Sequence, residues 1–445
     1  MELLASWLWQ PLLSFIYLEL GVLFLLVTGF AAWRYMGLAF SDLLHLRRHE
    51  SQLPASDNPH QRHISQSKGF MAALAATVGV GNWAGVSTAI HLGGPGALFW
   101  IWVSALVGMS MRMCSVWLTM YYQPKDPDSP LFATPMSYLE KFSGGRTWLP
   151  LTFAVLLLVQ GLFSAFIQSN SVAHAIENEV GESHLVVSLL LATLVGIVIL
   201  GGVQKIVAVT TQIVPLMVAI YLLAGLYILL SDPLLTLNTL GEVFTYAFTP
   251  YAVGGGVAGY SVLVAIQFGV ARGVFSHSSG LGLAPFLQAS HQEQRHRSAL
   301  LAGQVPVIDT LIICSVTGLV VLSYGDWQAL NGAFLTVESF AVTFGSEGRL
   351  VLITLLLFFA YTTLVTWAYF AERSLHYLRI ERDTEFRWLF ILCVAIGPWF
   401  PVTFIWSLGD LIIGVALLLN MIPLFWLTLQ HQQQMRRELT VRFGR

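Results

Sequence analysis

The stretch ATVGVGNWAGV at residues 76–86 decides how we interpret the whole chain. It lies in the middle of an apolar segment, residues 70–92, that is long enough to cross a bilayer core of roughly 30 Å as a helix. Three glycines and an asparagine at its centre loosen the helical backbone. A break at this depth exposes carbonyl and N–H groups that lipid cannot satisfy, so it must face protein or water. Alternatively, the glycines form a close-packed face against a neighbouring helix.

A second glycine-rich stretch, GVARGVFSHSSGLG at residues 269–282, lies in another apolar segment far along the chain. Two broken spans at corresponding places in two halves of a chain indicate the binding site of a secondary transporter. The C-terminal end of a half-helix offers carbonyls to a cation, and the N-terminal end of the next offers N–H groups to an anion. We therefore predict a broken helix at both places.

The composition indicates a membrane protein and excludes several other classes. Apolar residues make up 56% of the 445 residues and charged residues 10%, whereas soluble domains carry about 25% charged residues. No basic block suggests nucleic acid, and the three cysteines lack the spacing of a disulfide or metal site. The chain also lacks a zinc-binding histidine pair, a serine elbow and a nucleotide-binding loop, so we do not expect an enzyme.

Hydropathy divides the chain into eleven predicted spans. They cover residues 11–33, 70–92, 97–121, 149–176, 185–200, 206–230, a broken seventh span that follows the connection 232–256 and ends near residue 283, and then 299–322, 350–369, 389–401 and 405–429. With the first loop in the cytoplasm, all 22 Lys and Arg except Arg112, Arg272 and Arg349 fall on the cytoplasmic side or in the cytoplasmic tail. This predicts an outside N-terminus and a cytoplasmic C-terminus.

These spans suggest a division of the chain into repeats. Residues 1–40 form a peripheral N-terminal span, 66–230 a first repeat of spans 2–6, 250–430 a second repeat of spans 7–11, and 431–445 a basic cytoplasmic tail. Because each repeat has an odd number of spans, the second is inserted upside-down relative to the first, and the site lies at their interface near mid-membrane.

Several motifs resemble those of the alanine or glycine:cation symporter family. They are GNWAGV at residues 81–86, HLGGPGA at 91–97 with Trp100 and Trp102, RGVFS at 272–276, GLG at 280–282, IDT at 308–310, and FAYTT at 359–363 with Trp367 and Glu372. The resemblance covers nearly the whole chain and implies an all-α, leucine-transporter-like 5+5 inverted repeat with one extra N-terminal helix. It also implies sodium-coupled uptake of a small neutral amino acid, such as alanine or glycine, across a bacterial-type inner membrane.

Two positions depart from the family pattern. Residues 276–280 read SHSSG where the family usually reads Ser-Asn-Glu-Ala-Gly, so an acid is lost and the imidazole of His277 is gained. Trp83 replaces a smaller aliphatic residue. A histidine there either couples protons or is a satisfied neutral donor. The departure also leaves open a non-transporting amino-acid sensor.

The two breaks supply candidate substrate ligands. Neither contains Asp or Glu, so an ammonium group would rely on neutral oxygens, which favours a neutral amino acid. N–H groups around Gly79, Gly81, Asn82 and Trp83 suit the carboxylate, Ser276 and Gln168 offer neutral oxygens, and Phe275 and Trp367 wall the side-chain pocket. The alternatives are a hydrogen bond between helices for Gln168 and ordinary packing for the two aromatic residues.

Sodium requires several hard, uncharged oxygens. The carbonyls of Ala75 and Val78 lie just before the first break, and the family fold implies that the hydroxyls of Thr362 and Thr363 complete the site. Alternatively, each hydroxyl bonds back to its own helix. Among the remaining intramembrane charges, Arg272 either pairs with Asp309 or reaches toward an interface.

Overall fold

The computed structural model describes residues 8–50, 66–180, 184–251, 261–289 and 294–443. The parts of our predicted segments that fall on residues 1–7, 51–65, 181–183, 252–260, 290–293 and 444–445 lie outside this description. The helices of the first half are α2 (Ser14–Thr28), α3 (Ala31–Arg34), α4 (Met36–Glu50), α5 (Gln66–Thr77), α6 (Ala84–Gly93), α7 (Gly96–Tyr122), α8 (Met136–Phe142), α9 (Trp148–Val180), α10 (His184–Ile199) and α11 (Gly202–Ser231).

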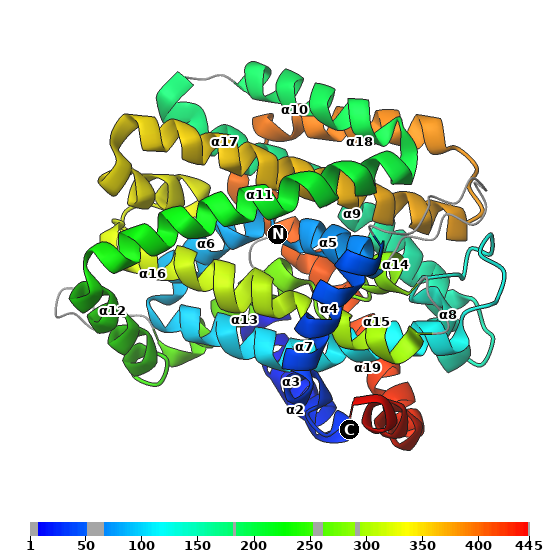
Figure 1. The fold of residues 1–445 in the computed structure, drawn as a ribbon. Helices are drawn as coiled ribbons and strands as arrows, with labels where there is room; N and C mark the ends of the chain where they lie inside the picture. Colours follow the sequence, from blue (N-terminus) through cyan, green and yellow to red (C-terminus); the bar gives the residue numbers. More distant parts are fainter. Residues whose placement is uncertain (1–7, 51–65, 181–183, 252–260, 290–293, 444–445) are drawn as a thin grey trace.

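The second half contains a similar series of long and interrupted helices. They are α12 (Pro233–Tyr246), α13 (Val262–His277), α14 (Pro285–Gln288), α15 (Arg295–Ala302), α16 (Ser315–Tyr324), α17 (Gly332–Tyr377), α18 (Asp383–Ile396) and α19 (Val402–Phe443). In Figure 1, α12 and α8 lie at opposite ends of the molecule, and the long helices α11 and α17 run between these ends. The N-terminal α2 and the end of α19 lie side by side, in agreement with their direct packing.

Among the described residues, six helices are long and apolar enough to cross a membrane, and the bent pair α5–α6 makes a seventh. Shorter apolar helices occupy Ser14–Thr28, His184–Ile199 and Val262–His277, where we predicted spans 1, 5 and 7. The eleven spans therefore stay a prediction.

The first predicted break is present. Helix α5 ends at Thr77, and the chain bends by 56° before it continues as α6. Gly79 adopts an extended conformation, and a 3₁₀ turn follows at Val80–Asn82. All of these residues are buried within the protein. A side chain at position 79 would overlap the hydroxyl of Thr363 on α17, so only glycine fits there.

The second break lies later than the glycine pattern suggests. Helix α13 runs without interruption through Gly269 and Gly273 and ends at His277, after which Ser278 takes a left-handed conformation with φ of 53°. Gly269 and Gly273 pack directly on α7, so they form a close-packed face of the kind that was our alternative interpretation for the first stretch. The break itself uses Gly280, whose φ of 87° strongly favours glycine.

Three helical segments differ from our prediction. The connection 232–256 contains α12, which an Asp232 side chain caps at its N-terminus. Helix α17 begins at Gly332, well before the predicted span 350–369, and changes direction at Gly345. Finally, α19 continues as a helix to Phe443, through most of the residues that we assigned to a basic tail. All three additions are only partly apolar, so hydropathy provides little signal for them.

The α7–α13 contact gives a stability prediction. A Cβ at Gly269 would lie 2.6 Å from the Ala97 carbonyl oxygen and from Trp100 Cβ. We expect Gly269→Ala to lower the free energy of unfolding by about 1–3 kcal/mol in an SDS titration, because the backbone of α7 must move. Gly241→Ala on the exposed face of α12 meets nothing within 4 Å and should stabilise by about 0.5–1 kcal/mol. Equal stabilities of the two variants would contradict the packing assignment.

Candidate functional site

The first break releases backbone carbonyls because two N–H groups bond to side chains instead of to the helix. In a continuous helix, Gly79 N–H would donate to the Ala75 carbonyl. Here it donates to Asn82 Oδ1 at 2.8 Å, and Val80 N–H donates to Gln168 Oε1 at 3.2 Å. The Ala75 carbonyl is thereby left at the negative end of the α5 dipole without its usual helical partner.

Thr363 occupies this helix end. Its hydroxyl lies 3.2 Å from the Ala75 carbonyl and 3.3 Å from the Val78 carbonyl. Three of the four predicted sodium ligands therefore meet at one point. The hydroxyl of Thr362 does not join them, because it donates to the carbonyls of Phe358 and Phe359 in its own helix at 3.0 and 3.2 Å.

Asn82 connects three interrupted segments. Its Nδ2 donates to Ser276 Oγ at the end of α13 and to Asp309 Oδ1, both at 3.0 Å. Asp309 lies in a π-helical stretch, Val307–Cys314, that separates α15 from α16. π-Helical stretches often mark functional sites. The predicted residues Asn82 and Ser276 are therefore in direct contact, as the paired breaks suggested.

The buried carboxylate of Asp309 was not among our predicted ligands. It is fully buried and accepts hydrogen bonds from Ser276 and Thr310 at 2.8 and 2.7 Å, besides the one from Asn82. Among the described residues, none of the ion pairs includes it. The carboxylate thus lies beside two of the predicted substrate ligands, Asn82 and Ser276, although neither break contains an acid in its sequence. The π-helical segment brings an acid to the two breaks, and an intramembrane acid is by itself a functional signal.

The predicted pairing of Arg272 with Asp309 is wrong. Arg272 forms a bidentate ion pair with Asp410 on α19, with Nη1–Oδ1 and Nη2–Oδ2 distances of 2.7 and 2.6 Å. Its guanidinium carbon lies 4.6 Å from the centre of the Trp406 ring. This pair lies at one wall of a cavity of about 330 Å³, which is also lined by Trp9, Thr88, Leu92, Gln267, Phe268, Ala271, Asn331, Val402, Thr403 and Ser407.

The two predicted aromatic walls have different neighbours. Phe275 packs against Trp406 with ring centres 4.9 Å apart, and a Cβ at Gly81 would lie 3.0 Å from its ring. Phe275 thus lies between Gly81 of the first break and Trp406 of the cavity wall. Trp367 packs against Phe370, 5.7 Å away, and the described contacts do not bring it to Phe275. Trp406 is the partner that sequence reasoning missed, since tryptophans in spans usually only pack.

Two further predicted groups are already engaged. Asn82 N–H and Trp83 N–H donate within the 3₁₀ turn to the carbonyls of Gly79 and Val80 at 3.1 Å, so in this conformation they do not face a substrate carboxylate. The Trp83 ring packs against Tyr221, with ring centres 4.8 Å apart, and against Phe359, with ring centres 5.5 Å apart. The tryptophan that departs from the family pattern therefore fills an aromatic cluster.

His277 is held as a neutral imidazole. Its Nδ1 accepts the Ser279 N–H at 3.1 Å, so Nε2 carries the proton and faces Ser104 Oγ at 3.2 Å. The carbonyl of His277 accepts a hydrogen bond from Arg112 Nη1 at 2.8 Å. This favours the satisfied neutral donor over a proton carrier.

Comparison with known proteins agrees with this geometry. The fold is leucine-transporter-like: MhsT in complex with L-phenylalanine superposes with a TM-score of 0.56 over 84% of this chain and 98% of that chain, at 14% identity. A model of the sodium:alanine symporter family matches residues 1–438. The chain belongs to this family, whose members are transporters and not enzymes.

Individual relatives show the same assignment. The sodium/alanine symporter AgcS of Methanococcus maripaludis is 34% identical over 95% of this chain and 93% of its own length. An uncharacterized transporter of Haemophilus influenzae is 35% identical over 91% of this chain and 90% of its own. A probable sodium/glutamine symporter, GlnT of Bacillus subtilis, is 29% identical over 95% of this chain and 86% of its own.

The Arg272–Asp410 pair yields the second prediction. Arg272→Met leaves the Asp410 carboxylate without its partner in a largely apolar wall, so we expect the free energy of unfolding to fall by about 3 kcal/mol. The double variant Arg272→Met/Asp410→Leu should recover most of this loss, because no charge stays uncompensated. An SDS titration of both variants tests this, and a double variant no more stable than Arg272→Met would show that the unpaired Asp410 carboxylate is not the cause of the loss.

Proposed function

We propose that the protein couples sodium entry to the uptake of a small neutral amino acid by alternating access. The observation that carries this proposal is the meeting of Thr363 Oγ1 with the carbonyls of Ala75 and Val78 at the end of α5. Three uncharged oxygens at the negative end of a helix suit a monovalent cation. We further propose that residues 66–230 and 250–430 form the inverted repeats, with residues 1–40 peripheral to them.

The proposed substrate site lies beside this cation site, where Asn82 and Ser276 meet. Gly79 and Gly81 allow the backbone of the break to approach a ligand, and Phe275 covers it from the cavity side. The Asp309 carboxylate supplies a negative charge for the ammonium group, so the pocket suits a zwitterion. Gln168 and Trp367 stay as proposed outer contacts, because Gln168 positions Val80 and Trp367 lies one helical turn beyond Thr363.

The names of two relatives support an amino-acid substrate but differ in its identity, since one is a sodium/alanine and the other a probable sodium/glutamine symporter. We propose alanine, glycine or a similar small residue, because both breaks are closely packed. We also propose that the face carrying the C-terminus is cytoplasmic, as the positive charges predict.

Uptake into proteoliposomes tests the proposal directly. Labelled glycine, alanine, serine and glutamine are offered under a sodium gradient or a proton gradient imposed separately. We expect accumulation of a small neutral amino acid under the sodium gradient alone, because both ring nitrogens of His277 are used by a neutral imidazole. Accumulation driven by protons would assign coupling to His277, and binding without accumulation under either gradient would identify a sensor.

The cation site gives the third prediction. Thr363→Val removes one oxygen and keeps the side-chain shape, so the sodium concentration for half-maximal uptake should rise about tenfold, equivalent to about 1.4 kcal/mol. Thr362→Val measures the predicted role of the neighbouring hydroxyl in the same assay. Thr366→Val is the matched control, since its hydroxyl donates to the Thr362 carbonyl at 2.8 Å within its own helix. If the sodium dependence of uptake is unchanged in Thr363→Val, the Thr363 hydroxyl is not a sodium ligand.

A further inference from the structure

Helix α19 carries an arginine–carboxylate pair near each of its ends. Asp410, in its third turn, binds Arg272 at the cavity, and Glu438, in its last turns, binds Arg295. The two carboxylates are 28 positions apart in the sequence, roughly 40 Å along an α-helix. The two pairs therefore lie near opposite ends of α19.

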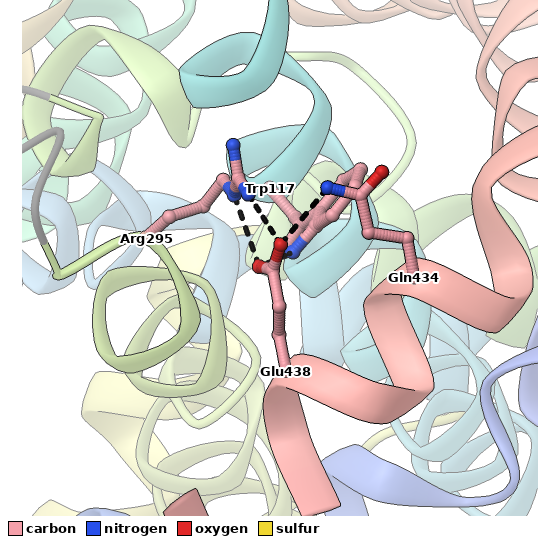
Figure 2. Close-up of polar contacts among 4 residues, drawn as sticks. All are labelled: Trp117, Arg295, Gln434 and Glu438. Carbon is pink, nitrogen blue, oxygen red and sulfur yellow. Dashed lines mark hydrogen bonds and ion pairs between the residues drawn. The ribbon is translucent and has the colours of Figure 1, made fainter. Parts of the chain in front are cut away.

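Glu438 is the centre of the contact at the far end (Figure 2). Its carboxylate forms an ion pair with Arg295 at the start of α15 and accepts hydrogen bonds from Arg295 Nε at 3.1 Å and Trp117 Nε1 at 3.0 Å. Gln434, one turn earlier on α19, donates to the same carboxylate at 3.1 Å. The Arg295 guanidinium carbon lies 4.7 Å from the centre of the Trp117 ring. We call the contacts of Glu438 with Arg295 and Trp117 the C-terminal latch.

Neighbouring residues extend this contact along α19. His431 forms a hydrogen bond with Tyr122 of α7, and Met435 lies 3.9 Å from the thiol of Cys114, also on α7. Arg436 donates to the carbonyls of Leu26 and Val27 at the end of α2. The last turns of α19 thus hold α7, α15 and α2 together (Figure 1).

The segments held by the latch are the ones that support the site. α7 contributes Ser104 and Arg112, which fix His277 at the second break. α15 is followed, after residues 303–306, by the π-helical stretch with Asp309. Because the last turns of α19 contact both α7 and α15, a movement of these two helices away from them would break the contacts of Glu438. Since Arg295 and Glu438 remain 22% and 26% exposed, water can solvate both charges when they separate, so the contact is suited to reversible opening.

We propose that the C-terminal latch closes the face of the transporter that carries the C-terminus, and that the site opens to this face only when Glu438 separates from Arg295 and Trp117. This inference rests on the proposed alternating access. The Arg272–Asp410 pair near the other end of the same helix joins α13 to α19 and is not part of this latch. The Arg272–Asp410 and Arg295–Glu438 pairs are both formed in this structure, so the C-terminal latch is closed in it.

Cys114 is a native reporter of the latch, because it is fully buried beneath Met435. The rate of its alkylation by N-ethylmaleimide is measured in nanodiscs by peptide mass mapping, with Cys393 on α18 as the internal reference. Loss of a partly exposed ion pair and its cation–π contact should raise the Cys114 rate about fivefold in Glu438→Gln. Arg295→Gln should give the same rise, and the double variant no further rise, because both substitutions open one contact.

The matched control is Arg437→Gln, which alters an exposed charge on the neighbouring residue of α19 without touching the latch. If Glu438→Gln does not fold, Trp117→Phe keeps the ring beneath Arg295 and removes one hydrogen bond, and a smaller rise is expected. Equal Cys114 rates in the wild type and the latch variants, or a parallel rise at Cys393, would overturn the latch. Labelling needs neither sodium nor amino acid, so a negative result here is distinct from a failure of sodium-driven uptake.

Discussion

The hydrogen bond from Gly79 N–H to the Asn82 side chain is the interaction on which the site depends. An α-helix keeps its carbonyls occupied until its last turn. By turning one N–H toward Asn82, the chain frees the Ala75 carbonyl in the interior of the protein. The same asparagine then uses its amide nitrogen to hold Ser276 and Asp309. A single side chain therefore both opens the first helix and fixes the position of the second break beside it.

Most of the charged side chains inside the membrane-spanning part have a compensating partner, and Asp309 is the exception among those described below. Arg272 and Asp410 neutralise each other, so their role is to join α13 to α19. Arg112 donates to the carbonyl of His277 at the end of α13, where a cation is favoured by the helix dipole. Asp309 differs from these, because its described partners are neutral donors. A buried carboxylate of this kind is costly unless a cation approaches it, which fits a region that binds cations transiently.

The sequence was sufficient for the first break and much of its surroundings. Glycines and an asparagine in the middle of an apolar span weaken a continuous helix, and the family resemblance placed Thr363 beside Ala75 and Val78. The second break was harder, because glycines that pack on α7 and glycines that end α13 look alike in the sequence. Partners of charges were not predictable, since Arg272 and Asp410 are brought together only by the tertiary fold. Trp406 is one of many aromatic residues in the apolar spans, and the end of α19 has an ordinary mixture of polar and apolar residues. Nothing in the sequence therefore marked either of them.

Both breaks expose backbone carbonyls at the end of a helix, but different side chains contact these carbonyls. At the end of α13, the fixed guanidinium of Arg112 donates to the carbonyl of His277. At the end of α5, the neutral hydroxyl of Thr363 lies against the carbonyls of Ala75 and Val78. The guanidinium of Arg112 already compensates the helix-end carbonyl at the second break, so a diffusible cation would gain little there. At the first break, the helix-end carbonyls lie beside a neutral hydroxyl that adds an oxygen of its own. Under the proposed function, this asymmetry would favour the first break as the site of a coupling ion, although both breaks have the same backbone chemistry.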